Sequence, residues 1–325
     1  MRGAARPGTG RSQRVTPGNS PRSGFRTMTV VSTGGARLHT EIHGPDGAPT
    51  VVLVHGWTCR IAFWHPVLDE LAADHRVVVY DLRGHGRTPP TPGACGTKAL
   101  ADDLCAVLDA TVPAGERAVV CGHSMGGMAV MAAADRPGLY ARARAAVFCS
   151  TGADRLVPDS TVIPLRAGAL RSALQRRLLR TRLPYGPVTP LSQRLVAAIA
   201  LGPGAPPRLR ARTARIVQSA PRRARAEWGA VLARLDLADR LGRLTLPVTL
   251  VHGEADRLTP PVHLERLASR LPEVTQTVLV PGAGHMTPLE NPGAVAAAIR
   301  AQAAAGRRGP GRSPAGGTTE ERDPA

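Results

Sequence analysis

The chain has 325 residues, of which 43% are hydrophobic, so it can bury a large core and carry an insertion. This composition excludes an intrinsically disordered protein. The formal charge of +18 is typical of nucleic-acid binding, but residues 1–27 carry +6 of it and residues 151–240 carry +12, so the rest is close to neutral. A solvated Arg-rich surface that follows from composition explains this distribution best, and we expect no specific nucleic-acid partner.

The two ends of the chain, residues 1–27 and 306–325, are polar and rich in Gly, Pro and Arg, so we expect two disordered tails, the first of them basic. Translation is expected to start at Met28, which directly precedes the first strand-like run. The chain begins without the apolar stretch of a signal peptide, and no stretch reaches the roughly 18 apolar residues of a membrane span. Its five cysteines, an odd number without a Cys-x-x-Cys pair, favour reduced thiols and a cytoplasmic location.

The predicted elements start with a hairpin of residues 28–32 and 36–42 around Gly34 and Gly35. Continuous β-branched runs then predict strands covered on both faces, whereas apolar residues at helical spacing predict helices. In chain order these elements are a strand at 50–54, a helix at 61–74, a strand at 76–80, a helix around 100–108, a strand at 117–121, a helix at 125–134 and a strand at 145–149.

The alternation of strands and helices stops in residues 154–240, where Pro, Arg and Leu form helix-like pieces without a strand run. It then resumes with a strand at 247–251, a helix at 261–271, a strand at 275–280 and a helix at 292–304. Such alternation predicts an α/β fold with a mostly parallel central sheet flanked by helices. We expect one domain built from residues 28–153 and 241–305, with residues 154–240 inserted as a helical cap.

A candidate nucleophile, Ser124, lies in the Gly-x-Ser-x-Gly pattern between a predicted strand and a predicted helix. In a sharp strand-to-helix turn, side chains two residues before and after the serine would collide, which explains Gly122 and Gly126. The turn exposes the hydroxyl and directs the Met125 N–H toward a reacting carbonyl oxygen. In a glycine-rich chain the pattern alone is also compatible with a tight turn that holds an incidental serine.

The loop after the strand at 50–54 has the sequence His55-Gly56-Trp57. It is expected to supply the second donor of an oxyanion hole, the backbone N–H of Trp57, since Gly56 lets the backbone approach a substrate closely. His55 lies next to the end of a buried strand, where a hydrogen-bonded structural role is more common than acid–base chemistry.

Two further loops at strand ends carry the candidate acid and base. Asp256 follows the strand at 247–251, and His285 follows the strand at 275–280. The carboxyl ends of parallel strands meet at one edge of a sheet, so these residues are expected to meet Ser124 there. His285 would accept the hydroxyl proton, and Asp256 would orient the imidazole and stabilise its charged form. Asp154 is a second candidate for the acid.

These segments resemble the α/β-hydrolase superfamily, in its cap-bearing single-domain branch, over residues 28–305. Its motifs match at His55-Gly56-Trp57, at Asp81–Thr88, at Gly122–Gly127 and in the loops of Asp256 and His285. The resemblance implies the α/β-hydrolase fold, a cap that roofs the pocket and a supporting role for the loop at 81–88. Clustered metal ligands and a Gly-x-Gly-x-x-Gly nucleotide loop are both absent from the sequence, so we expect neither a metal nor a cofactor.

The expected function is a serine hydrolase that cleaves small or medium carboxylic esters through an acyl-enzyme. The partner would then be a small-molecule ester. A cofactor-free haloperoxidase-like or perhydrolytic enzyme and a C–C bond hydrolase share these motifs and remain alternatives. A non-catalytic binding protein on this fold, and association with membrane or nucleic acid through the basic tail and cap, are further alternatives.

Overall fold

The computed structural model describes residues 24–91 and 93–305. The tail expected at residues 306–325 and residues 1–23 of the tail expected at 1–27 lie outside this range. The boundary expected at residue 28 is two residues late, because the first strand begins at Arg26, where it pairs with Ile42.

The described residues form one eight-stranded sheet with the order β1-β2-β4-β3-β5-β6-β7-β8. β1 and β2 pair antiparallel, as does β2 with β4, and the other strands are parallel. The strands are β1 (Arg26–Ser32), β2 (Ala36–His43), β3 (Thr50–Val54), β4 (Arg76–Tyr80), β5 (Ala118–His123), β6 (Ala143–Cys149), β7 (Val248–Gly253) and β8 (Val274–Val280). This arrangement confirms the predicted mostly parallel α/β sheet flanked by helices.

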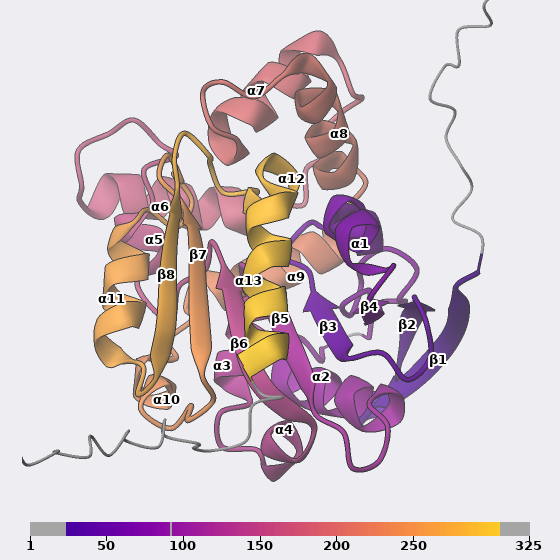
Figure 1. Ribbon diagram of the computed structural model, residues 1–325. Coiled ribbons are helices and arrows are strands. Elements are labelled where there is room, and N and C mark those ends of the chain that lie inside the picture. The colour runs from indigo at the N-terminus through magenta and orange to yellow at the C-terminus, as the bar shows by residue number, and fades with distance from the viewer. Residues whose placement is uncertain (1–23, 92, 306–325) are drawn as a thin grey trace, which may run out of the picture.

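Helices cover both faces of the sheet (Figure 1). The helices are α1 (His65–Leu71), α2 (Thr97–Thr111), α3 (Met125–Ala132), α4 (Pro137–Arg142), α5 (Leu156–Asp159), α6 (Ala169–Leu179), α7 (Pro190–Ala200), α8 (Pro207–Gln218), α9 (Arg222–Leu232), α10 (Ala238–Leu241), α11 (Val262–Arg270), α12 (Thr287–Glu290) and α13 (Pro292–Ala305). Two 3-10 turns, η1 (Thr33–Gly35) and η2 (Ile61–Trp64), complete the described elements.

The central strands are apolar at consecutive positions because both of their faces are buried. In β3, Val52 and Val54 pack into a core shared with α2, α3 and α11, whereas Val51 and Leu53 pack into a second core with α1 and α13. All four side chains are fully buried. The alternation of side chains along a strand therefore divides one β-branched run between two cores.

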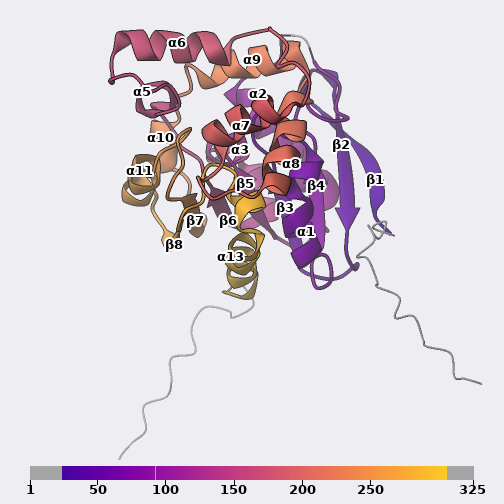
Figure 2. The ribbon, with the colours of Figure 1, turned by 90° about the horizontal axis from the view of Figure 1, so that it is seen from above.

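The segment between β6 and β7 is helical throughout its regular parts, α5 to α10, and the structure describes all of it. Seen from above, α5 to α9 lie over one end of the sheet (Figure 2). Trp228 of α9 ties this segment to the body, because its buried indole N–H donates to the backbone oxygen of Arg83 at 2.8 Å. We refer to residues 154–240 as the cap, following the expected boundaries.

The expected helix at 61–74 is divided. Residues 61–64 form η2, and α1 extends only from His65 to Leu71. The carboxylate of Asp81 accepts the backbone N–H of Ile61 at 2.7 Å and so fixes the start of this segment. Two short helices, α4 and α12, were not predicted from the sequence. Each has a proline in its first or second position. Among the described residues, no helix is both long enough and apolar enough to cross a membrane.

A buried ion pair connects the loop after β4 to α2. The guanidinium of Arg83 donates to both carboxylate oxygens of Asp103, at 2.6 and 2.7 Å, and both side chains are almost fully buried. Arg83→Met would leave a buried carboxylate without its partner, so we expect the free energy of unfolding to fall by about 3–5 kcal/mol. Urea denaturation measures this loss.

Arg223→Met is the matched control, since Arg223 makes an exposed i,i+4 pair with Glu227. It should lower stability by only about 0.5 kcal/mol or less. Equal effects of the two substitutions would contradict a special contribution of the buried pair.

Candidate active site

Ser124 lies at the sharp turn between β5 and α3. Its backbone has φ 51° and ψ −117°, a strained conformation for a residue with a side chain. A Cβ atom at Gly122 would lie 2.5 Å from the backbone of Gly126, and one at Gly126 would collide with the backbone oxygen of Val54. These two contacts explain why glycine flanks the serine on both sides, and the turn places Ser124 on the wall of a cavity.

The backbone N–H and carbonyl groups of Ser124 are hydrogen-bonded, whereas two neighbouring N–H groups are not. Its N–H donates to the oxygen of Cys149 at 3.0 Å, and its carbonyl oxygen accepts the Thr151 hydroxyl at 2.8 Å. The N–H groups of Met125 and Trp57, the two expected oxyanion donors, have no acceptor among the described residues. Trp57 and Ser124 line the same cavity, so these two N–H groups remain the candidate donors of an oxyanion hole.

The structure brings Asp256 and His285 into contact. Nδ1 of His285 lies 2.8 Å from Oδ2 of Asp256, and both side chains are buried. Thr259 joins them, because its hydroxyl donates to the same carboxylate oxygen at 2.8 Å and lies 3.2 Å from Nδ1 of His285. The other carboxylate oxygen accepts the N–H groups of Leu258 and Thr259. Both carboxylate oxygens of Asp256 thus accept two hydrogen bonds each. Because Nδ1 of His285 donates to Asp256, Nε2 of His285 is the nitrogen left free to accept a proton.

The surroundings of Asp256 favour its charged form. Burial alone would raise the pKa of this carboxyl, but the charge and hydrogen bond of His285, together with His252 and the Thr259 N–H, lower it below its usual value. Nε2 of His252 donates to the backbone oxygen of Thr259, 2.6 Å away, and burial lowers the pKa of the His252 ring. These surroundings therefore favour Asp256 as an anion, which is what an orienting acid needs.

The loop of His285 is held from several directions. Its backbone N–H donates to Ala200 of α7 at 2.9 Å, and its carbonyl oxygen lies 2.9 Å from Nε2 of His123. The carboxylate of Glu290 accepts the N–H groups of Gly284 and Met286 in this loop, and that of Gly202 in the cap. Burial lowers the pKa of His123 well below its usual value, so this ring is neutral. The cap therefore helps to position His285.

The other residues considered from the sequence are engaged elsewhere. Asp154 accepts Arg266 and Arg270, each at 3.1 Å. His55 is fully buried, with one ring nitrogen 2.8 Å from the Gly56 oxygen and the other accepting the Leu82 N–H at 3.0 Å. Burial lowers the pKa of His55 to about 4. Its hydrogen bonds are those of a structural residue.

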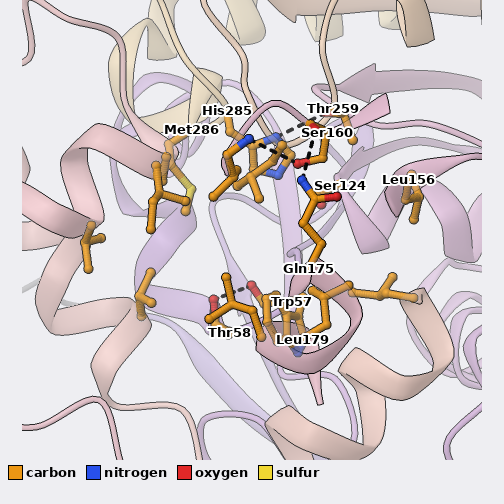
Figure 3. A pocket seen from close by; sticks show the side chains of 18 of the residues that line it. Trp57, Thr58, Ser124, Leu156, Ser160, Gln175, Leu179, Thr259, His285 and Met286 are labelled. Carbon is orange, nitrogen blue, oxygen red and sulfur yellow. Dashed lines mark hydrogen bonds between the residues drawn. The ribbon is translucent and has the colours of Figure 1, made fainter. Parts of the chain in front are cut away.

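A cavity of about 300 Å³ brings Ser124 and His285 onto one surface. Figure 3 shows His285, Thr259 and Ser160 along one side of it and Trp57, Thr58 and Leu179 along the other. Most of its lining is apolar, and the cap supplies a large share of it, including Leu156, Val157, Val162, Leu178, Leu179, Leu195, Val196, Ile199, Ala200, Val217 and Leu232. The cavity thus joins a polar end, at Ser124 and His285, to an apolar volume.

Three contributors to this site escaped the sequence analysis: Thr259, His123 and Glu290. Thr259 could have been noticed, since an aspartate in a turn commonly bonds to groups a few residues further along the chain. The contacts of His123 and Glu290 depend on the tertiary structure alone. Among the described residues there is also no cluster of three or more His, Cys, Asp or Glu side chains placed to hold a metal ion.

Comparison with known proteins matches residues 51–298 to the model of the alpha/beta hydrolase family. A putative carbamate hydrolase, RutD, of Variovorax paradoxus is 32% identical over 259 residues, which cover 76% of this chain and 89% of that protein. The pimeloyl-(acyl-carrier protein) methyl ester esterase of Aromatoleum aromaticum is 32% identical over 233 residues, which cover 69% and 86%. Among solved structures, a thermophilic esterase from Thermogutta terrifontis superposes with a TM-score of 0.68 at 27% identity, covering 85% of this chain and 97% of that one.

Proposed function

This chain belongs to the alpha/beta hydrolase family, and from that premise we propose that it is a serine hydrolase that cleaves carboxylic esters through an acyl-enzyme. The supporting observation is the 2.8 Å contact between Asp256 and His285 beside a cavity that His285 shares with the strained Ser124. The glycines on both sides of Ser124 support the proposal further, because they permit a strained backbone conformation that lowers the stability of the fold.

In the proposed mechanism, Oγ of Ser124 attacks the ester carbonyl carbon while Nε2 of His285 takes the hydroxyl proton. Negative charge develops on the carbonyl oxygen, where the N–H groups of Trp57 and Met125 stabilise it. The C–O bond then breaks, and His285 returns its proton to the leaving alcohol. Water attacks the acyl-enzyme with His285 again as base, which releases the acid and restores Ser124.

The apolar cavity favours an ester with a hydrophobic acyl or alcohol group. Burying each methylene is worth about 0.8 kcal/mol, so an acyl chain that fills this volume should bind better than acetate. Two relatives of this chain bear the names of hydrolases, one for a carbamate and one for the methyl ester of pimeloyl-(acyl-carrier protein). We therefore propose small to medium carboxylic esters as the substrate class.

A series of p-nitrophenyl esters with increasing acyl length tests this proposal. We expect kcat/KM to rise about fourfold per methylene until the cavity is filled, and then to fall. Leu156→Trp, in the cavity wall, should move the optimum to shorter chains. Leu279→Trp, on the exposed side of β8, is the matched control and should leave the optimum unchanged. Absence of hydrolysis at every chain length would rule out the proposed ester hydrolase.

A further inference from the structure

Large apolar side chains are exposed mainly on one part of the cap. Twelve such side chains are exposed among the described residues, and eight of them lie between residues 165 and 195. These eight are Leu165, Leu170, Leu174, Leu178, Leu183, Val188, Leu191 and Leu195. We call this surface, residues 165–195, the leucine–arginine surface. Such a concentration of exposed apolar side chains in one segment is unusual on a soluble protein and points to a site of interaction.

Helix α6 shows how this surface is built. Leu170, Leu174 and Leu178 follow each other at four-residue spacing and form one exposed row. Ser172 and Gln175 face the interior, and Gln175 donates to the backbone of Ser160 at 2.9 Å. The helix therefore docks in part through polar side chains while three of its leucines stay exposed, unlike the usual amphipathic arrangement.

Arginines border this row of leucines. Arg176 and Arg177 are exposed on α6, and Arg180 is exposed directly after its end. Arg177 follows Leu174 by three residues and therefore lies beside the leucine row. Residues 160–221 contain eleven arginines and no acidic residue. Such a surface repels a second copy of itself, since like charges would face each other across the contact. It attracts an anionic partner.

The leucine–arginine surface is continuous with the mouth of the cavity. Leu178 of α6 and Leu195 of α7 are 42% and 58% exposed, and both also line the cavity that holds Ser124 and His285. An apolar molecule lying on this surface thus has an apolar route to the reacting end. A nucleic-acid backbone would contact the arginines but would not bury the leucines, whereas a lipid surface accommodates both leucines and arginines.

We propose that the leucine–arginine surface docks on an anionic lipid surface and lets amphiphilic esters enter the cavity from it. The leucines enter the interfacial region, and the arginines bind the negatively charged headgroups. Docking is independent of the catalytic proposal. The delivery of esters rests on the ester hydrolase proposed above.

Co-sedimentation of the full chain with vesicles tests the docking. We expect binding to phosphatidylcholine vesicles that contain 30% phosphatidylglycerol, about tenfold stronger than to phosphatidylcholine alone, and weaker at high salt. Two combined variants change the surface without touching the cavity lining: Leu170→Ser with Leu174→Ser and Leu191→Ser, and Arg176→Glu with Arg177→Glu. Each should reduce binding to the anionic vesicles at least about tenfold.

Matched controls alter exposed residues elsewhere. Val31→Ser with Val262→Ser and Leu279→Ser removes the same number of apolar side chains, and Arg37→Glu with Arg243→Glu makes the same change in net charge. Both should bind vesicles as the unaltered chain does. The proposal is overturned if the unaltered chain does not bind, if the surface variants bind normally, or if a DNA duplex binds and only the arginine variant weakens it.

Activity assays keep the two proposals apart. The surface variants should hydrolyse soluble p-nitrophenyl acetate at the normal rate but a vesicle-embedded p-nitrophenyl ester at least about tenfold more slowly. Normal rates on both substrates would overturn the delivery of esters from a lipid surface. Loss of hydrolysis in every form of the chain would instead overturn the ester hydrolase, and vesicle binding would still report on the docking.

Discussion

Ser124→Ala should reduce kcat for ester hydrolysis by on the order of 10⁴- to 10⁶-fold, the largest effect that we expect from any substitution. Without Oγ no acyl-enzyme forms, and only the oxyanion donors and the binding cavity remain to accelerate attack by water. The methyl group of alanine fits the turn, since the backbone already carries a Cβ atom there. Steady-state hydrolysis of a p-nitrophenyl ester measures the loss, and circular dichroism shows that the fold is retained.

Covalent labelling provides an independent readout of the same change. A fluorophosphonate probe should attach to one residue, Ser124, in the unaltered chain and to none in Ser124→Ala. Ser219→Ala is the control, since the Ser219 hydroxyl bonds to the end of α8 at Ile216 and lies outside the cavity lining. It should label and hydrolyse normally. Labelling that persists in Ser124→Ala would show that another residue is the nucleophile.

Asp256→Asn is expected to have the second largest effect, a decrease in kcat of about 10⁴-fold. The amide has nearly the shape of the carboxylate, but it carries no charge to stabilise the imidazolium of His285. Asparagine can also present an N–H to Nδ1, which would hold the ring in the tautomer with its proton on Nε2. The hydroxyl of Thr259, 3.2 Å from Nδ1, offers no replacement charge.

Glu254→Gln is the matched control for Asp256→Asn. Its carboxylate is two residues away and accepts the backbone N–H of Gly282 at 3.0 Å, without contact to His285. This substitution should change kcat by less than about threefold, in the range of an exposed hydrogen bond. A comparable loss in both variants would mean that local charge, and not the Asp256–His285 contact, governs activity.

Much of the fold was predictable because its signals are local. Apolar runs such as Val51–Val54 predict strands buried on both faces. Apolar residues at helical spacing predict α2 and α11 from the local sequence alone. The helix expected at 61–74 begins instead with a 3-10 turn at 61–64, because the Asp81 carboxylate, from the end of another strand, bonds to the Ile61 N–H. Helices α4 and α12 are one or two turns long, too short for a periodic pattern to show.

By itself the sequence determined the fold class and the group of residues that meet at one sheet edge. Parallel strands place their carboxyl ends together, and steric crowding in a tight turn requires glycine beside Ser124, so both follow from local pattern. Only the tertiary structure decided that Asp256, and not Asp154, contacts His285, that Thr259 joins them, and that the cap forms an apolar cavity with an exposed leucine border. These depend on contacts between residues far apart in the chain, whose free energies of packing no local pattern encodes.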